Sequence, residues 1–417
     1  MGLGPKGRFI ALLSRWLTCG HMWFMKHRIQ TGLDRLIETE CAQLKGRRIA
    51  VLCHAASVAS DYRHITQVLR DYSVDVVRCF GPEHGIWADA QDMIAVDERS
   101  RERITGAPVI SLYGTDEASL APDASDFNGV DVLLIDLQDV GARYYTYIYT
   151  AALCIRVAGQ CGVETIVLDR PNPISGETIE GRMTGRDFLS FVGLWPLPTR
   201  HGLTIGEVSQ LLSAREHFEA KVSVIEMRGW QRSMYFDDTG LPWVQPSPNM
   251  PTLDTAIVYP GMCLLEGTTM SEGRGTTRPF ELVGAPYIDP FEFANELNGL
   301  KLPGIAFRPI YYQPTFHKHA EQTIGGIATH VFDRTQFQPL RMGLHFLAAV
   351  RRLYGQHLEW RTEVYEFVTD RLAIDLLFGC EDARHEIDGC ASTAQLDSLW
   401  RSWQDESDAF AQARKPF

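Results

Sequence analysis

The chain has 417 residues, of which 45% are hydrophobic and 22% charged, and its formal net charge is -12. This length exceeds one ordinary core and indicates two domains, and the composition is that of a soluble globular protein. The negative charge makes a nucleic-acid partner a poor candidate, although a few local arginines can still hold an anionic ligand.

The cysteines and the N-terminal segment are evidence on the cellular compartment of the protein. There are nine cysteines and no Cys-x-x-Cys pair, so neither a zinc ribbon nor a disulfide framework is supported. Free thiols fit a reducing compartment, and we therefore predict a cytoplasmic protein. Residues 1–28 begin with basic residues and a short apolar run, but Arg15 interrupts the run and no clear cleavage site follows. We expect an N-terminal extension there, with export or a periplasmic location as the alternative, and no later stretch is apolar enough to span a membrane.

From residue 47 onward, short apolar runs alternate with helical patterns. The runs predict strands over 47–54, 74–80, 108–113, 130–137, 163–169 and 221–227. Helical spacing is present over 62–72, 145–162 and 204–218, and the last helix starts with Thr204 and Glu207 in the arrangement of a capping box. This alternation predicts a doubly wound α/β domain with a parallel sheet over about residues 29–230.

The sequence pattern changes after residue 230. Residues 239–252 are rich in proline and turn formers and predict a linker or an ordered loop, and residues 266–290 predict a long loop. Further on, the pattern predicts a helix over 289–300, strands over 304–316 and 325–333, a helix over 339–355 and helical segments to the end. Residues 231–417 are therefore expected to form a second, smaller α/β domain.

Polar residues follow the predicted parallel strands, at the sheet edge where ligands gather in such folds. The second strand leads into the sequence GPEHG, and other strands lead into the polar residues His54, Tyr113, Asp136, Gln138, Asp139, Asp169, Arg170 and Asn172. A sheet does not need so many polar groups at one edge for stability. Their convergence predicts a functional site there.

Common cofactor and nucleophile motifs are absent. The first strand is followed by CHAASVASDY and not by GxGxxG, and SEGRGTTRPFE lacks the lysine of a P-loop, so a dinucleotide or nucleotide cofactor is not expected. There is no GxSxG serine elbow. His54, His84 and His201 could meet Asp136 or Asp169 at a metal, but no closely spaced histidine pair supports this, and structural histidines are more common.

Proton transfer by a carboxyl group is the chemistry that remains. Glu83 follows Pro82 at a strand end and precedes a glycine turn, which suits a rigidly held acid, although most acids in turns are simply exposed. His84 is either its partner or a hydrogen-bonding group for a substrate. The candidates for a second acidic group are Asp136, Asp139, Asp169, Glu266, Glu272 and Glu281.

Other residues suggest ligand binding. Arg143 and Tyr144 lie close to the strand edge, and Asn249 lies in the proline-rich segment. Tyr147 and Tyr149 are better explained by packing, while Trp243 suits packing and a sugar platform equally. Arg274 and Arg278 could hold a carboxylate in a planar fork.

A series of motifs spans nearly the whole chain: FGPEHG, DLQDVGARYYTYI, LDRPNPISG, RHGLTIGE, GLPWVQPSPNMPT, YPG, EGTTMSEGRGTTRPFELVGAP and LPGIAFRP. In this order they resemble the motifs of the NamZ-type exo-β-N-acetylmuramidases. The resemblance implies a Rossmann-like N-terminal domain and a smaller C-terminal α/β domain with the site between them. It also implies a glycosidase of muropeptide turnover that removes β-linked N-acetylmuramic acid from the non-reducing end of peptidoglycan fragments.

The resemblance makes Glu83 the leading catalytic residue, with His84 as the second catalytic candidate. Together with the residues named above, the substrate-binding candidates are Asp136, Arg143, Tyr144, Asp169, Arg170, Asn172, His201, Asn249, Glu266, Glu272, Arg274, Arg278 and Glu281. The expected partners are saccharides of N-acetylmuramic acid and N-acetylglucosamine, with no metal or organic cofactor. The alternatives are a sugar-binding protein without catalysis and a metal-dependent hydrolase using His84, His201 and Asp169. The stereochemistry and the oligomeric state stay open.

Overall fold

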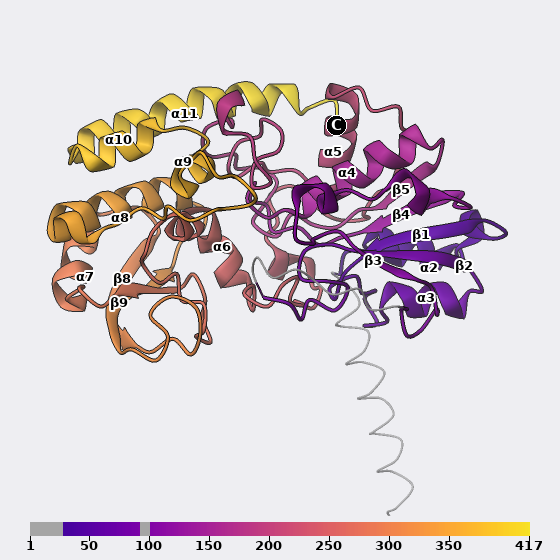
Figure 1. Ribbon diagram of the computed structural model, residues 1–417, viewed down its shortest axis with the longest axis horizontal. Coiled ribbons are helices and arrows are strands. Elements are labelled where there is room, and N and C mark those ends of the chain that lie inside the picture. Colours follow the sequence, from indigo (N-terminus) through magenta and orange to yellow (C-terminus); the bar gives the residue numbers. More distant parts are fainter. Residues whose placement is uncertain (1–27, 92–100) are drawn as a thin grey trace, which may run out of the picture.

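The computed structural model describes residues 28–91 and 101–417 (Figure 1). The predicted extension over residues 1–28 lies almost wholly outside these residues. None of the helices in the described part of the chain is long and apolar enough to cross a membrane. The cysteines in the described ranges are free thiols, and the compartment stays a prediction.

The first part of the chain forms a six-stranded sheet in which every pairing is parallel. In spatial order its strands are β3 (Val109–Ser111), β2 (Asp75–Gly81), β1 (Arg48–Cys53), β4 (Val132–Asp136), β5 (Glu164–Leu168) and β6 (Val222–Ile225). The strand order reverses between β1 and β4, which is the point at which doubly wound sheets bind ligands. The predicted Rossmann-like parallel sheet is confirmed.

Helices cover both faces of this sheet (Figure 1). They are α2 (Gly32–Glu38), α3 (Ile65–Asp71), α4 (Tyr147–Gln160) and α5 (Ile205–Arg215). Alternate residues of β1 face opposite sides: Ile49 and Val51 pack in the core with α2 and α3, while Ala50 and Leu52 pack in the core with α4 and α5. A strand that is buried on both faces must be apolar at every position, which explains the continuous apolar runs. The predicted capping box of α5 is present, because the Thr204 side chain accepts from the Glu207 amide and the Glu207 carboxylate accepts from the Thr204 amide.

The second part is built on a three-stranded antiparallel sheet in the order β7 (Leu282–Ala285), β9 (Ile324–Val331) and β8 (Ile305–Tyr312). Its helices are α6 (Leu253–Met262), α7 (Pro290–Gly299), α8 (Pro339–Tyr354), α9 (Ala373–Phe378), α10 (Asp382–Asp388) and α11 (Thr393–Ala413). The smaller α/β domain is confirmed, with one difference from expectation: the predicted loop over 266–290 contains β7. Helix α6, for which there was no prediction, contains Pro260.

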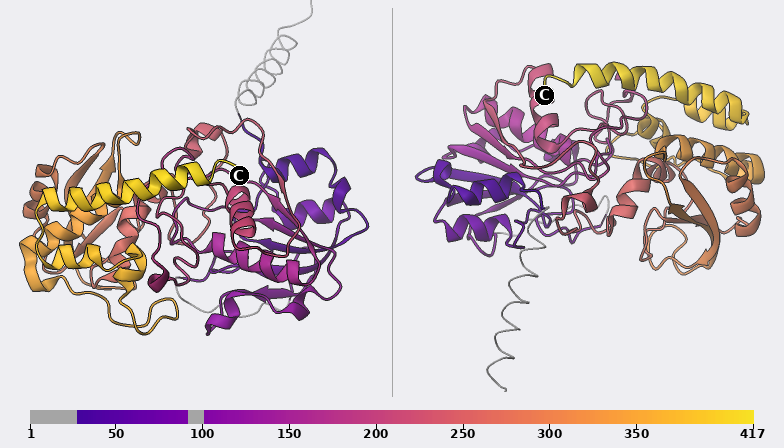
Figure 2. Two further views of the ribbon diagram at one scale, coloured as in Figure 1. Left: turned by 90° about the horizontal axis from the view of Figure 1, so that it is seen from above. Right: turned by 180° about the vertical axis from the view of Figure 1, so that it is seen from behind.

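The two parts share a continuous hydrophobic core, which runs from α4 and α5 through α6 to α8 and α9. Helix α11 reinforces this connection by running back from α10 until the C-terminus lies beside α5 (Figures 1 and 2). Its Ser407 hydroxyl donates to the Gly181 carbonyl at 2.8 Å, and its Glu406 carboxylate accepts from the Met183 amide at 3.0 Å. The exact boundary at residue 230 stays a prediction.

Candidate active site

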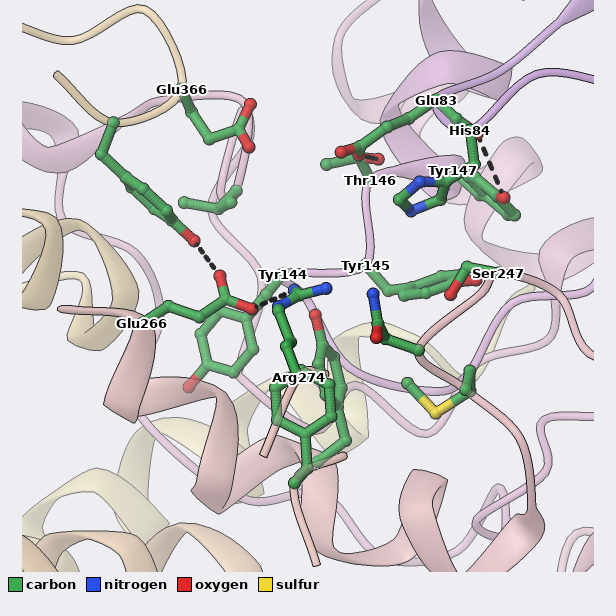
Figure 3. A pocket seen from close by; sticks show the side chains of 16 residues that line it. Glu83, His84, Tyr144, Tyr145, Thr146, Tyr147, Ser247, Glu266, Arg274 and Glu366 are labelled. Atoms are coloured by element: carbon green, nitrogen blue, oxygen red, sulfur yellow. Dashed lines mark hydrogen bonds and ion pairs between the residues drawn. The ribbon is translucent and has the colours of Figure 1, made fainter. Parts of the chain in front are cut away.

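A cavity lies between the carboxyl edge of the parallel sheet and the second part of the chain. It encloses about 460 Å³ of space, including solvent at its mouth. Side chains from both parts line it: Glu83, His84, Tyr144, Tyr145, Thr146, Tyr147, Val192, Ser247, Asn249, Met250, Tyr259, Glu266, Arg274, Phe280, Tyr365 and Glu366. Figure 3 shows Glu83, His84 and Thr146 on one side of it and Glu266 and Glu366 on the other.

Glu83 is a buried acid held by a hydrogen bond from an uncharged donor. Strand β2 ends at Gly81, so Pro82 carries the chain directly to Glu83 at the sheet edge. The Glu83 carboxylate accepts from the Thr146 hydroxyl at 2.8 Å, and its side chain is only 6% exposed (Figure 3). The acid therefore has a fixed position next to the cavity, which is what proton transfer to a bound substrate requires.

His84 follows in a left-handed backbone conformation with a φ of +70°. Its Nδ1 lies 2.9 Å from the Ala90 carbonyl and must donate to it, because a carbonyl only accepts. Burial lowers the pKa of His84 and Arg274 lowers it further, while Glu83 opposes the shift. A neutral His84 with a proton on Nδ1 leaves Nε2 as a hydrogen-bond acceptor.

Aromatic rings form much of the cavity wall. Tyr145 lies edge to face with Tyr147 at 4.7 Å between ring centroids, and Tyr259 lies edge to face with Phe280 at 4.8 Å. The Tyr147 hydroxyl lies 2.8 Å from the Pro246 carbonyl and 3.3 Å from the Glu83 carbonyl, which are its acceptors. Rings with polar tips suit the apolar face and the hydroxyl groups of a sugar. Tyr147 itself is 1% exposed and its hydroxyl is used by these carbonyls, so it packs as expected while its side chain also lines the cavity.

On the opposite side, Arg274 is the cation of the cavity. One of its terminal nitrogens donates to the Glu266 carboxylate at 2.6 Å, and its guanidinium lies over the Phe280 ring at 5.2 Å from the centroid. The Tyr365 hydroxyl donates to the other Glu266 oxygen at 2.7 Å. Arg274 is 6% exposed and Glu266 is 5% exposed, so the pair is largely desolvated.

Glu272 supports Arg274 from behind the cavity. Its carboxylate lies 3.3 Å from Arg274 Nε, 3.0 Å from His317 Nδ1 and 2.9 Å from Lys318 Nζ. Burial alone would raise the pKa of Glu272, but Lys318, His317 and Arg274 hold it well below its usual range. The resulting ion network fixes the loop that carries Arg274.

The structure brings six of the predicted site residues to the cavity: Glu83, His84, Tyr144, Asn249, Glu266 and Arg274. The Asn249 amide donates to Gln91 Oε1 at 2.9 Å, and the Tyr144 hydroxyl donates to the Pro260 carbonyl at 3.3 Å. These two side chains therefore also tie separate segments together.

Four predicted residues at the strand ends do not line the cavity. Arg170 forms a buried two-pronged ion pair with Asp136, with Nη2 at 2.9 Å from Oδ2. Asp169 accepts from the Gly206 amide in the first turn of α5, and burial raises the pKa of Asp169 to about 7. Asn172 donates to the Leu203 carbonyl at 2.9 Å and accepts from the Ile174 amide. Each of these polar groups is used within the sheet edge itself.

The other predicted residues also lie outside the cavity lining. Arg143 is fully buried and donates to the carbonyls of Arg182, Leu197 and Leu377, which fastens three segments together. His201 Nε2 lies 3.3 Å from Asp139, and its Nδ1 accepts from the Leu203 amide. The remaining predicted residues hold the loop on either side of Arg274: Glu272 as described, and Arg278 and Glu281 as an ion pair with each other.

No group of three or more potential metal ligands comes together among residues 28–91 and 101–417. The three residues of the metal-dependent alternative have different contacts. His84 lines the cavity, His201 faces Asp139, and Asp169 accepts from the first turn of α5.

Among the cavity residues that sequence reasoning missed, Thr146, Tyr365 and Glu366 carry polar groups. Thr146 lies inside the motif DLQDVGARYYTYI, and its hydroxyl at the start of a predicted helix was the available clue. Tyr365 and Glu366 lie far along the chain, in a segment without a local pattern, and only the tertiary fold brings them to the cavity.

The fold and the carboxyl-lined cavity agree with a class of glycosidases. Two family models match, for the N-terminal domain of the exo-β-N-acetylmuramidase NamZ over residues 49–254 and for its C-terminal domain over residues 257–417, and the chain belongs to this family. It is therefore a glycosidase, and the alternative of a binding protein without catalysis is wrong.

Individual relatives agree. The chain is 40% identical over 393 residues to the peptidoglycan β-N-acetylmuramidase NamZ of Bacillus subtilis (strain 168), covering 94% of this chain and 91% of that protein. It also resembles two crystal structures of DUF1343 family proteins from Bacteroides fragilis NCTC 9343. One has a TM-score of 0.82 at 29% identity and covers 93% of this chain and 99% of that one. The other has a TM-score of 0.72 at 24% identity over 93% and 98% of the two chains, and shows the fold alone.

Proposed function

We propose that this protein is an exo-acting hydrolase that releases β-1,4-linked N-acetylmuramic acid from the non-reducing end of peptidoglycan fragments, with Glu83 as the catalytic acid. The observation that carries the proposal is the placement of Glu83, a buried carboxyl at the end of β2 that faces the cavity and is oriented by Thr146. The substrate class is supported by family membership and by the relative from Bacillus subtilis.

The chemistry requires a proton on the departing sugar oxygen. Breaking a glycosidic bond generates positive charge on the anomeric carbon and negative charge on the leaving oxygen. A carboxyl group within hydrogen-bonding distance of that oxygen lowers the barrier by donating its proton as the bond breaks. Glu83 is the cavity carboxyl that lies at the carboxyl end of a parallel strand, where ligands of such sheets bind.

Arg274 accounts for the choice of a muramic acid. This sugar differs from N-acetylglucosamine by a lactyl ether, which carries a carboxylate at neutral pH. A largely buried guanidinium in the cavity wall supplies positive charge to a carboxylate, in addition to its pairs with Glu266 and Glu272. Of the two arginines considered from the sequence, Arg274 lines the cavity and Arg278 does not.

The proposed role of Glu83 is tested by changing the leaving group. Glu83→Gln should hydrolyse a disaccharide of N-acetylmuramic acid and N-acetylglucosamine at least about 100-fold more slowly than the unmodified protein, because the departing sugar needs a proton. The loss should be much smaller on an aryl glycoside of N-acetylmuramic acid, whose phenolate departs without one. Release of the free sugar is measured by chromatography, with the exposed Glu117→Gln as the matched control.

A Glu83→Gln protein that hydrolyses the disaccharide at the normal rate would show that Glu83 is not the acid. If the unmodified protein hydrolyses neither substrate, the proposed reaction itself is wrong.

A further inference from the structure

Glu366 enters the cavity on a two-residue turn with an unfavourable backbone. Tyr365 and Val368 form an isolated antiparallel bridge, with the Val368 amide donating to the Tyr365 carbonyl at 3.0 Å. The two residues between them, Glu366 and Phe367, have φ angles of +46° and +67°. Positive φ at both central positions defines a type I′ turn, for which asparagine and glycine are the preferred residues. A glutamate and a phenylalanine in these positions are strained, and such strain is concentrated at functional sites.

The turn is inserted into the protein and does not project from its surface. Residues 362–364 and 369–370 on either side are exposed, whereas Tyr365 and Glu366 are buried, at 1% and 5% exposure. A strained surface turn would be free to relax, but this one is held on both sides. The Tyr365 hydroxyl donates to Glu266, and the Phe367 ring lies 5.9 Å from the Tyr113 ring.

Glu366 connects the second part of the chain to the parallel sheet. Its carboxylate accepts from the hydroxyl of Tyr113, which lies just after β3 at the carboxyl edge of the sheet, at a distance of 3.2 Å. Figure 3 shows Glu366 and Glu83 on separate chain segments at opposite sides of the cavity. Two carboxyl groups that reach the cavity from opposite walls can lie on either side of a bound glycosidic bond, as the two carboxyl groups of glycosidases do.

We propose that Glu366 is the second catalytic residue of the hydrolysis, the general base that activates the attacking water. This inference rests on the proposed function. Glu83 gives its proton to the glycosidic oxygen as the bond from that oxygen to C1 breaks and the bonding electrons move to the oxygen. The water oxygen forms the new bond to C1, and one water proton passes to the Glu366 carboxylate. Proton exchange with solvent then restores both groups, and the net reaction consumes one water molecule.

Glu266, the cavity carboxyl that we considered from the sequence, has a different role. It is bound by both Arg274 and Tyr365, so its charge is committed to orienting the cation that faces the substrate. The other predicted second acids, including Asp136 and Asp169, do not line the cavity. The cavity geometry and the strained turn both support Glu366 as the base.

The first experiment compares leaving groups. Glu366→Gln should lower kcat by about 100-fold or more with little change in KM, because the variant lacks the base but keeps the cavity. The loss should be similar on the disaccharide and on the aryl glycoside, since water attack is impaired in both, whereas loss of the acid Glu83 is felt mainly on the disaccharide. Glu363→Gln, an exposed carboxyl on the same segment, is the matched control and should behave as the unmodified protein.

The second experiment separates catalysis from folding. Glu366→Asn places at the turn a residue that accepts positive φ, so its melting temperature should equal or exceed that of the unmodified protein while its hydrolysis is lost. A purely structural Glu366 would give the opposite result, with a lower melting temperature and retained turnover, and would overturn the proposal.

The third experiment tests the direction of water attack. Water activated from the wall opposite the acid should give the α-anomer of N-acetylmuramic acid first, which proton NMR detects before mutarotation. A β-anomer as the first product, or normal turnover by Glu366→Gln, overturns the general-base role and leaves the role of Glu83 untouched. Absence of hydrolysis by the unmodified protein overturns both.

Discussion

The two walls of the cavity hold their functional groups by different physical means. On the wall formed by the parallel sheet, Glu83 is positioned by the end of β2 and by the neutral hydroxyl of Thr146. On the wall formed by the second part of the chain, Arg274 is positioned by the carboxylates of Glu266 and Glu272. We call the first the sheet wall and the second the loop wall. The sheet wall depends on strand geometry, and the loop wall depends on paired charges.

This difference has consequences for stability. A neutral hydrogen bond contributes on the order of 1 kcal/mol, whereas a buried ion pair is strongly destabilising when only one partner is removed. The sheet wall should therefore tolerate substitution of a supporting group, while the loop wall should respond sharply. The stability that each wall contributes should also depend on pH, over a different pH range for each wall.

The largest effect is expected from Arg274→Met. Removing the guanidinium leaves Glu266 buried with only the Tyr365 hydroxyl among its described side-chain partners, and weakens the network around Glu272. We expect the free energy of unfolding to fall by about 3–5 kcal/mol, as measured by urea denaturation. We also expect loss of activity towards muramic acid glycosides, because the cation proposed to bind the lactyl carboxylate is removed.

The control for this prediction is Arg48→Met. Arg48 pairs with Asp131 at 2.7 Å on the surface, where the two side chains are 52% and 37% exposed. Removing such an exposed pair should lower the free energy of unfolding far less than Arg274→Met does. Equal losses in the two variants would show that charge pairing does not distinguish the loop wall.

A smaller effect on stability is expected from lowering the pH, and the sheet wall should lose stability before the loop wall does. His54, just after β1, donates from Nδ1 to the Pro246 carbonyl and accepts the Gln138 amide at Nε2, so only the neutral ring satisfies both bonds. Burial lowers the pKa of His54 to about 3 from an ordinary value of 6.5. The unfolded chain therefore binds more protons than the folded one between these values, and stability falls as the pH falls. From pH 6.5 to pH 5 this histidine should cost roughly 1.5–2 kcal/mol.

The measurement is a series of urea denaturations at different pH values for the unmodified protein and for His54→Gln. The variant does not titrate and should show a weaker pH dependence in this range. Glu272, on the loop wall, has a pKa below its usual value of 4.5, so the stability that it contributes is present above pH 4.5 and is lost only at lower pH. If Glu272→Gln flattened the profile between pH 5 and pH 6.5 as much as His54→Gln, the contrast between the walls would be contradicted.

The sheet wall is the part that sequence reasoning predicted best. Parallel strands buried on both faces leave an unmistakable apolar pattern, and the residues at their carboxyl ends meet at one edge by topology alone. This reasoning led to Glu83 and His84. It led equally to Asp136 and Arg170, which neutralise each other in a buried pair. A pattern places residues at an edge but does not show which of them are used by their neighbours.

The loop wall could not be predicted in the same way. Arg274 and Glu266 were found through the motif that carries them, but Tyr365 and Glu366 follow no periodicity. Their location depends on a strained turn that is stabilised by contacts with Glu266 and Tyr113, which lie about a hundred residues or more away along the chain. Local propensity favours neither glutamate nor phenylalanine in such a turn, so the tertiary contacts decide the conformation.

The smallest effect concerns the support of Glu83 itself. Thr146→Val keeps the shape of the side chain and removes the hydroxyl that donates to the Glu83 carboxylate at 2.8 Å. If the sheet wall depends mainly on strand geometry, the loss should be about 0.5–1.5 kcal/mol, or roughly 2- to 13-fold in kcat/KM on the disaccharide. Thr146→Ser keeps the donor and should retain nearly normal activity. A loss in Thr146→Val as large as that in Glu83→Gln would mean that the hydroxyl, and not the end of β2, determines where the acid points.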